Sequence, residues 1–142
     1  MRAVAPLVDE LLSLPEISGR CRAVCCYIAE AHAVDEWPVP SARFNGSRGV
    51  VAVSQPKTAQ ARCALARQFA ADFRLSERLP LLVDDPNDEA FERTYAPWPL
   101  RLFLVGEDGR LIWLSEPDGD SFDGVIGELR ALLLRLPRRS GV

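Results

Sequence analysis

The sequence contains a single histidine, His32, and no two of its cysteines are spaced as Cys-x-x-Cys. It therefore lacks the ligand spacing of a zinc ribbon and the dithiol motif of a thioredoxin, and we predict no metal site. Free cysteine is among the most often buried residue types. We therefore expect structural roles, without disulfide bonds, for the four cysteines present: Cys21, Cys25, Cys26 and Cys63.

Long apolar runs and basic clusters are also missing. No run approaches the roughly 18 apolar residues that span a bilayer, and no basic-then-apolar leader marks a signal peptide. The 17 basic and 20 acidic residues give a net charge of −3, without a basic patch of the size that nucleic acid requires. We expect no nucleic-acid partner and no membrane segment, and a chain that is cytoplasmic as given or detached from a targeting segment.

Apolar side chains are plentiful enough to bury a core. Hydrophobic residues make up 48% of the 142 residues, a length that suits one domain. Helical spacing of apolar side chains predicts helices over residues 5–14 and 57–74, and a last helix capped by Ser121 or Asp123. Turn and cap residues at 86–88 predict a further small helix over residues 88–94. In the longest of these, the predicted apolar face consists of Ala61, Leu65, Phe69 and Phe73.

Short apolar runs predict the strands. They lie at residues 22–29, 49–53 and 81–83, and an Asp-Gly turn predicts a hairpin between 99–105 and 111–114. Alternating helices and strands indicate an α/β domain with a mostly parallel sheet, to which the hairpin adds antiparallel strands. This order of elements is that of a thioredoxin-like mixed sheet flanked by helices.

Glu30 and His32 stand at the carboxyl end of the first predicted strand. Two residues apart, they can hold a proton relay, because a carboxylate fixes the tautomer of an imidazole and favours its charged form. A lone histidine after a strand is, however, more often an ordinary loop residue. The pair alone leaves both interpretations open.

The surrounding stretch, Tyr-Ile-Ala-Glu-Ala-His-Ala-Val-Asp-Glu-Trp at 27–37, resembles the signature of the iodothyronine deiodinases. These are thioredoxin-fold oxidoreductases that remove iodine reductively from thyroid hormones. The matching positions are Tyr27, Ile28, Glu30, Ala31, His32, Asp35 and Trp37. Further similar stretches at 53–55, 62–63, 83–87 and 95–103 extend the resemblance over nearly the whole chain.

The resemblance implies the roles of the site residues. His32 and Glu30 would be catalytic, while Arg101, Tyr27 and Trp37 would bind the substrate, with Arg101 clamping its carboxylate. Without the resemblance, Arg101 reads as a solvent-exposed charge at a strand edge. The chain departs from the family pattern at Pro56, where a second histidine is usual, and at Glu36, where a glycine is usual.

The nucleophile of the family is a selenocysteine in a turn before the first long helix. The resemblance therefore implies that the first strand, the nucleophile turn and the selenocysteine lie upstream of Met1, and that the chain as given is inactive. A selenocysteine codon is ordinarily read as stop, so a gene model can begin falsely at the next methionine. The alternative is a genuinely shortened homologue. A missing strand also predicts exposed apolar area, and with it self-association or a homodimer.

Three functions remain open. The first is reductive removal of iodine from an iodinated, thyroid hormone-like aromatic, with a thiol reductant as co-substrate and no bound cofactor. The second is a thiol or peroxide redoxin, against which the Glu-Ala-His stretch argues. The third is a noncatalytic thioredoxin-like binding domain.

Overall fold

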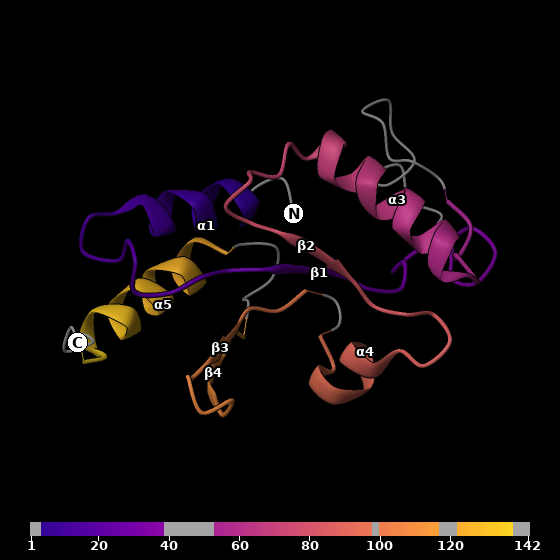
Figure 1. Ribbon diagram of the computed structural model, residues 1–142. Helices are drawn as coiled ribbons and strands as arrows, with labels where there is room; N and C mark the ends of the chain where they lie inside the picture. Colours follow the sequence, from indigo (N-terminus) through magenta and orange to yellow (C-terminus); the bar gives the residue numbers. More distant parts are fainter. Residues whose placement is uncertain (1–3, 39–52, 98–99, 117–121, 138–142) are drawn as a thin grey trace. The chain divides into compact units, whose positions relative to one another are not determined.

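A computed structural model describes residues 4–38, 53–97, 100–116 and 122–137 (Figure 1). Within these ranges helices alternate with short strands, so the chain belongs to the α/β class. The elements in chain order are α1 (Val4–Ser13), β1 (Cys25–Tyr27), α3 (Ala59–Asp72), β2 (Leu81–Val83), α4 (Ala90–Tyr95), β3 (Phe103–Val105), β4 (Leu111–Leu114) and α5 (Asp123–Arg135).

The strands of the described residues form two small sheets, one of β1 and β2 and one of β3 and β4. Cys25 N donates to Pro80 O at 2.8 Å, and Asp84 N donates to the carbonyl of Tyr27 at 2.9 Å. Because the partners advance along both strands together, β1 and β2 are parallel, as predicted. Of the strand predicted at 49–53, all but Val53 lies outside the described residues.

The first strand is shorter than predicted, covering Cys25–Tyr27 rather than 22–29. Its ladder ends where the Tyr27 carbonyl accepts the Asp84 amide. Beyond that point the backbone of Glu30 is hydrogen-bonded by the side chain of Gln55. Apolar composition alone does not reveal that a side chain replaces a neighbouring strand.

By its internal contacts the chain divides into two compact units. The first contains residues 1–25, 70–81 and 100–142, and the second contains residues 26–69 and 82–99. In the first unit α1 packs against α5 around two apolar clusters. The buried members of these clusters are Val4, Ala5, Val8 and Leu79 in one, and Leu11, Ile17 and Leu133 in the other.

The hairpin of the first unit is antiparallel, as predicted. Phe103 pairs with Leu114 and Leu104 with Trp113, and the register shifts before Val105. Gly109 lies in the turn at φ 78, in the left-handed region where a side chain would be strained. The Asp-Gly signal therefore identifies the turn correctly.

Of the two predicted caps of the last helix, Ser121 lies outside the described residues, and the side chain of Asp123 is not described either. The residue that precedes α5 is Phe122, and it makes no side-chain cap. A cap needs an oxygen acceptor at that position. Phe122 instead packs against the apolar cluster of Val4 and Val8. Packing thus decides where this helix begins.

The second unit holds α4 and residues 59–69 of α3. The side chain of Glu89, the residue before α4, does not cap that helix. Instead the buried Asp84, just after β2, accepts the backbone N–H groups of Phe91 and Glu92, each at 3.0 Å. Asp88, which lies in the predicted cap segment, accepts the N–H of Ala90 at 3.1 Å. The carboxylate of Asp84 thereby fixes the start of α4 against the end of β2.

Candidate functional site

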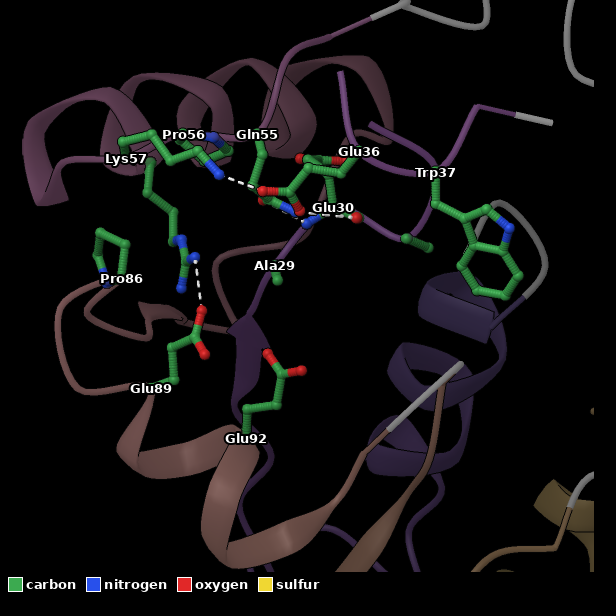
Figure 2. Close-up of a pocket in the computed structure, with 12 residues that line it drawn as sticks. Ala29, Glu30, Glu36, Trp37, Gln55, Pro56, Lys57, Pro86, Glu89 and Glu92 are labelled. Atoms are coloured by element: carbon green, nitrogen blue, oxygen red, sulfur yellow. Dashed lines mark hydrogen bonds and ion pairs between the residues drawn. The ribbon is translucent and has the colours of Figure 1, made fainter. Parts of the chain in front are cut away.

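A pocket of about 440 Å³ opens in the second unit (Figure 2). Four glutamates and two basic side chains give its lining a formal charge of −2. Oε2 of Glu92 is buried there, without a hydrogen-bond partner in the described part of the chain. The lining consists of Ala29, Glu30, Ala31, Glu36, Trp37, Gln55, Pro56, Lys57, Arg62, Pro86, Glu89 and Glu92.

Tyr27 and Glu30 are joined at one wall of this pocket. The Tyr27 hydroxyl donates a hydrogen bond to Oε1 of Glu30. The Tyr27 ring packs edge-on against Phe69 of α3, with centroids 5.3 Å apart. Burial raises the pKa of the Glu30 carboxyl above its ordinary value, and the charge of Arg62 opposes this shift. Glu30 is therefore readier to hold a proton than an exposed glutamate.

The backbone of Glu30 is held by one side chain, that of Gln55. Glu30 N donates to Gln55 Oε1 at 2.9 Å, and Gln55 Nε2 donates to the Glu30 carbonyl at 3.2 Å. Figure 2 shows Glu30, Gln55 and Glu36 gathered on one side of the pocket. The polar wall is thus built by hydrogen bonds between two separate segments of the unit.

His32 and Trp37 form an aromatic pair. Their ring centroids lie 5.5 Å apart at an interplanar angle of 61°, an edge-to-face arrangement. Trp37 lines the pocket and is 60% exposed, whereas His32 is half-buried. Of the five predicted site residues, Glu30 and Trp37 line the pocket. The proton relay from Glu30 to His32 stays a prediction.

Arg62, which sequence reasoning did not include in the site, is buried in the pocket wall at 1% exposure. Its guanidinium donates to the carbonyl of Asp84 at 3.2 Å and pairs with Glu89 at 3.5 Å. Of the predicted apolar face of α3, Leu65, Phe69 and Phe73 are half-buried and Ala61 is exposed. The buried residues of the helix are Arg62 and Ala66. The one sequence signal for this burial is the position of the charged Arg62 directly beside the predicted apolar face.

Pro56 and Glu36 both line the pocket. Pro56 is buried, and Glu36 forms an exposed ion pair with Lys57. The hydrogen bond from Lys57, and then that from Gln55, lower the pKa of Glu36, while Glu36 raises the pKa of Lys57. Exposed pairs of this kind add little stability. Glu36 and Lys57 instead contribute one negative and one positive charge to the pocket lining.

Arg101 belongs to the first unit, whereas the other predicted site residues belong to the second. It is half-buried rather than solvent-exposed, and its Nε has no hydrogen-bond partner among the described residues. The exposed strand-edge interpretation is therefore wrong. Convergence of Arg101 with Glu30 and His32 stays a prediction.

The four cysteines all lie in the described ranges, where they form no disulfide bond and are half-buried. Burial raises the pKa of the Cys21 and Cys25 thiols. None of the four lines the pocket. Within the described ranges no group of three metal-ligating side chains could hold a metal ion. In the same part of the chain, no helix has the length and apolar character to cross a membrane.

No protein-family model matches the chain, and no curated protein matches it either. The chemistry of the site is therefore argued from its own residues. These are a half-buried carboxyl with a hydroxyl donor, an edge-to-face histidine and tryptophan, and a buried arginine.

Proposed function

We propose that this chain carries the substrate pocket and the proton donor of a reductive dehalogenase of the iodothyronine deiodinase type, on a thioredoxin-like fold. The clustering of the signature residues carries the proposal. Tyr27, Glu30, His32 and Trp37 share one unit, and each takes part in one of two contacts, the Tyr27–Glu30 hydrogen bond and the His32–Trp37 ring pair. Glu30 and Trp37 also line the pocket.

The proposed reaction needs an iodinated aromatic, a selenolate, a proton and two thiols. A selenium–iodine bond forms as the carbon–iodine bond breaks, and the ring carbon keeps the electron pair and takes the proton. Two thiols then become a disulfide, while iodide and the selenolate are released. Because no cysteine lines the pocket, we propose that the selenolate comes from outside these 142 residues.

The predicted site residues have distinct roles in this reaction. Glu30, whose pKa is raised by burial, stores the proton, and His32 delivers it to the ring carbon. Trp37 offers an exposed face on which an aromatic ring stacks. The resemblance assigns the substrate carboxylate to Arg101, because a guanidinium suits a carboxylate.

Trp37 provides a direct test of the pocket. Iodine quenches indole fluorescence at short range, so 3,5-diiodotyrosine should quench the chain in a saturable way. Tyrosine, which lacks iodine, is the matched ligand and should not. In Trp37→Phe the other two tryptophans remain, and the saturable component should vanish. Saturable quenching that persists in Trp37→Phe, or none in the unaltered chain, would remove the pocket from the proposal.

A noncatalytic binding domain is the competing function, favoured by the absence of cysteine from the pocket lining. It uses the same pocket without chemistry, so iodide release separates the two. A thiol redoxin is less well supported. Its nucleophile needs a lowered thiol pKa, whereas burial raises the pKa of Cys21 and Cys25.

A further inference from the structure

Gln55 acts toward Glu30 as a neighbouring strand would. Its amide oxygen accepts the Glu30 N–H at 2.9 Å, and its amide nitrogen donates to the Glu30 carbonyl at 3.2 Å. Glu30 lies beyond the end of β1, and without Gln55 these two half-buried peptide groups would lose their described partners. An unpaired buried peptide group is costly. One side chain therefore completes the ladder that β1 leaves unfinished.

Only an amide of this length can make both bonds. A carboxylate keeps the acceptor but loses the donor, a methionine loses both, and asparagine is one methylene shorter. Gln55 is itself held in place by hydrogen bonds to other residues. Its backbone N donates to Asp35 Oδ1 at 2.8 Å, and its Nε2 donates to Glu36 Oε2 at 3.1 Å. Lys57 pairs with Glu36, and Val34 N donates to the carbonyl of Val53 at 2.9 Å.

These bonds tie residues 30–36, which include His32, to residues 53–57. We propose that Gln55 is the positioning residue of the pocket. Its amide holds the Glu30 peptide, so that the Glu30 carboxyl reaches the Tyr27 hydroxyl and faces the pocket. The hydrogen-bonding part of this inference stands alone, and its effect on iodide release rests on the proposed function.

The first test is hydrogen exchange of backbone amides in the chain itself, followed by NMR. In Gln55→Met the Glu30 amide loses its acceptor and should exchange about tenfold faster. The Arg62 amide, which donates to Thr58 O at 2.9 Å at the start of α3, should keep its rate. Gln68→Met, the same change at an exposed site on α3, should alter neither rate. An unchanged Glu30 rate, or equal acceleration of Arg62, would overturn the inference.

A second variant separates the two bonds. Gln55→Glu keeps the acceptor for the Glu30 N–H but loses the donor to the Glu30 carbonyl and to Glu36. Acidification protonates the new carboxyl and restores a donor. We therefore expect the ratio of the Glu30 to the Arg62 amide exchange rate in Gln55→Glu to approach that of the unaltered chain at low pH. If the Glu30 amide of Gln55→Glu exchanged faster by the same factor at every pH, this would contradict a role for the Nε2 donor.

The pKa of the Glu30 carboxyl gives a readout that a purely structural role would not move. In Gln55→Met the carboxyl is no longer held at the wall and becomes better hydrated, so its pKa should fall toward the ordinary value of 4.5. An unmoved pKa would contradict positioning. The neighbouring charged and titratable groups are the same in Gln55→Met as in the unaltered chain: Tyr27, His32, Asp35, Glu36, Lys57, Arg62, Glu89 and Glu92.

Iodide release gives the functional readout. With selenocysteamine and excess thiol as reductants and 3,5-diiodotyrosine as substrate, Gln55→Met should lower kcat about tenfold and leave KM nearly unchanged. A change confined to KM would contradict positioning. If the unaltered chain releases no iodide above the reagents alone, the proposed function fails, and the exchange rates still decide the role of Gln55.

Discussion

The hydroxyl of Tyr27, the last residue of β1, donates a hydrogen bond to the carboxylate of Glu30 at the pocket wall. The Tyr27 ring is held by Phe69 of α3. One side chain thus connects the end of a strand, a helix and the pocket carboxyl. The strength of this link can be measured without any substrate.

Tyr27→Phe keeps the ring contact and removes the donor. We expect a loss of about 1 kcal/mol in the free energy of unfolding, the usual net value of one hydrogen bond. Urea unfolding of Tyr27→Phe, Glu30→Gln and the double variant forms a cycle. The coupling should be about 0.5 kcal/mol or more. Strict additivity would show that the two groups do not interact.

Glu30 predicts a pH dependence of stability. Its pKa is raised in the folded chain, so the folded state binds the proton more tightly than the unfolded state. This contribution is complete below the ordinary value of 4.5 and is lost as pH rises through the raised folded pKa. Glu30→Gln does not titrate. As pH rises from about 4 through the raised folded pKa of Glu30, the unaltered chain should therefore lose stability relative to this variant. A constant difference would place Glu30 in solvent.

Arg62 opposes the effect of burial on Glu30. Arg62→Met removes the positive charge, so the pKa of the Glu30 carboxyl should rise further, as followed by carbon-detected NMR. Arg67→Met makes the same change at an exposed position of α3 and should leave that pKa in place. A fall, or an equal response to both substitutions, would contradict the placement of Arg62 beside Glu30.

Asp84 predicts a local effect on α4. Asp84→Ala removes both acceptors of the Phe91 and Glu92 N–H groups, which lie 3.0 Å from the carboxylate. The expected cost is about 1–2 kcal/mol in unfolding free energy, with faster amide exchange in α4. Asp72→Ala, at the exposed end of α3, is the control and should cost less than about 0.5 kcal/mol. Equal costs would show that the cap contributes nothing.

Much of the fold follows from local pattern. Helical spacing predicts α1, α3 and α5, and the Asp-Gly turn predicts the hairpin, because both signals lie within a few residues. The length of β1 was overestimated, since Gln55, 25 residues from Glu30, replaces a strand partner beyond Tyr27. Apolar periodicity carries no information about such a distant polar bond.

The pocket was predictable only in part. The signature at 27–37 identifies Tyr27, Glu30 and Trp37, whose described contacts are consistent with a shared site. The sequence does not predict the burial of Arg62 and Asp84. An arginine in a helix is expected at the surface, and an aspartate that follows a strand is expected in a turn. Their burial depends on partners from other segments, which one sequence does not reveal.

Iodide release from 3,5-diiodotyrosine tests the central claim most directly. The assay supplies selenocysteamine and excess thiol, and it compares the unaltered chain with His32→Ala and Glu30→Gln. General acid catalysis is typically worth about 100-fold or more. We predict that the unaltered chain accelerates iodide release at least about tenfold over the reagents alone, and that both substitutions abolish most of this gain. No acceleration, or full activity in His32→Ala, would contradict the dehalogenase and leave a binding domain.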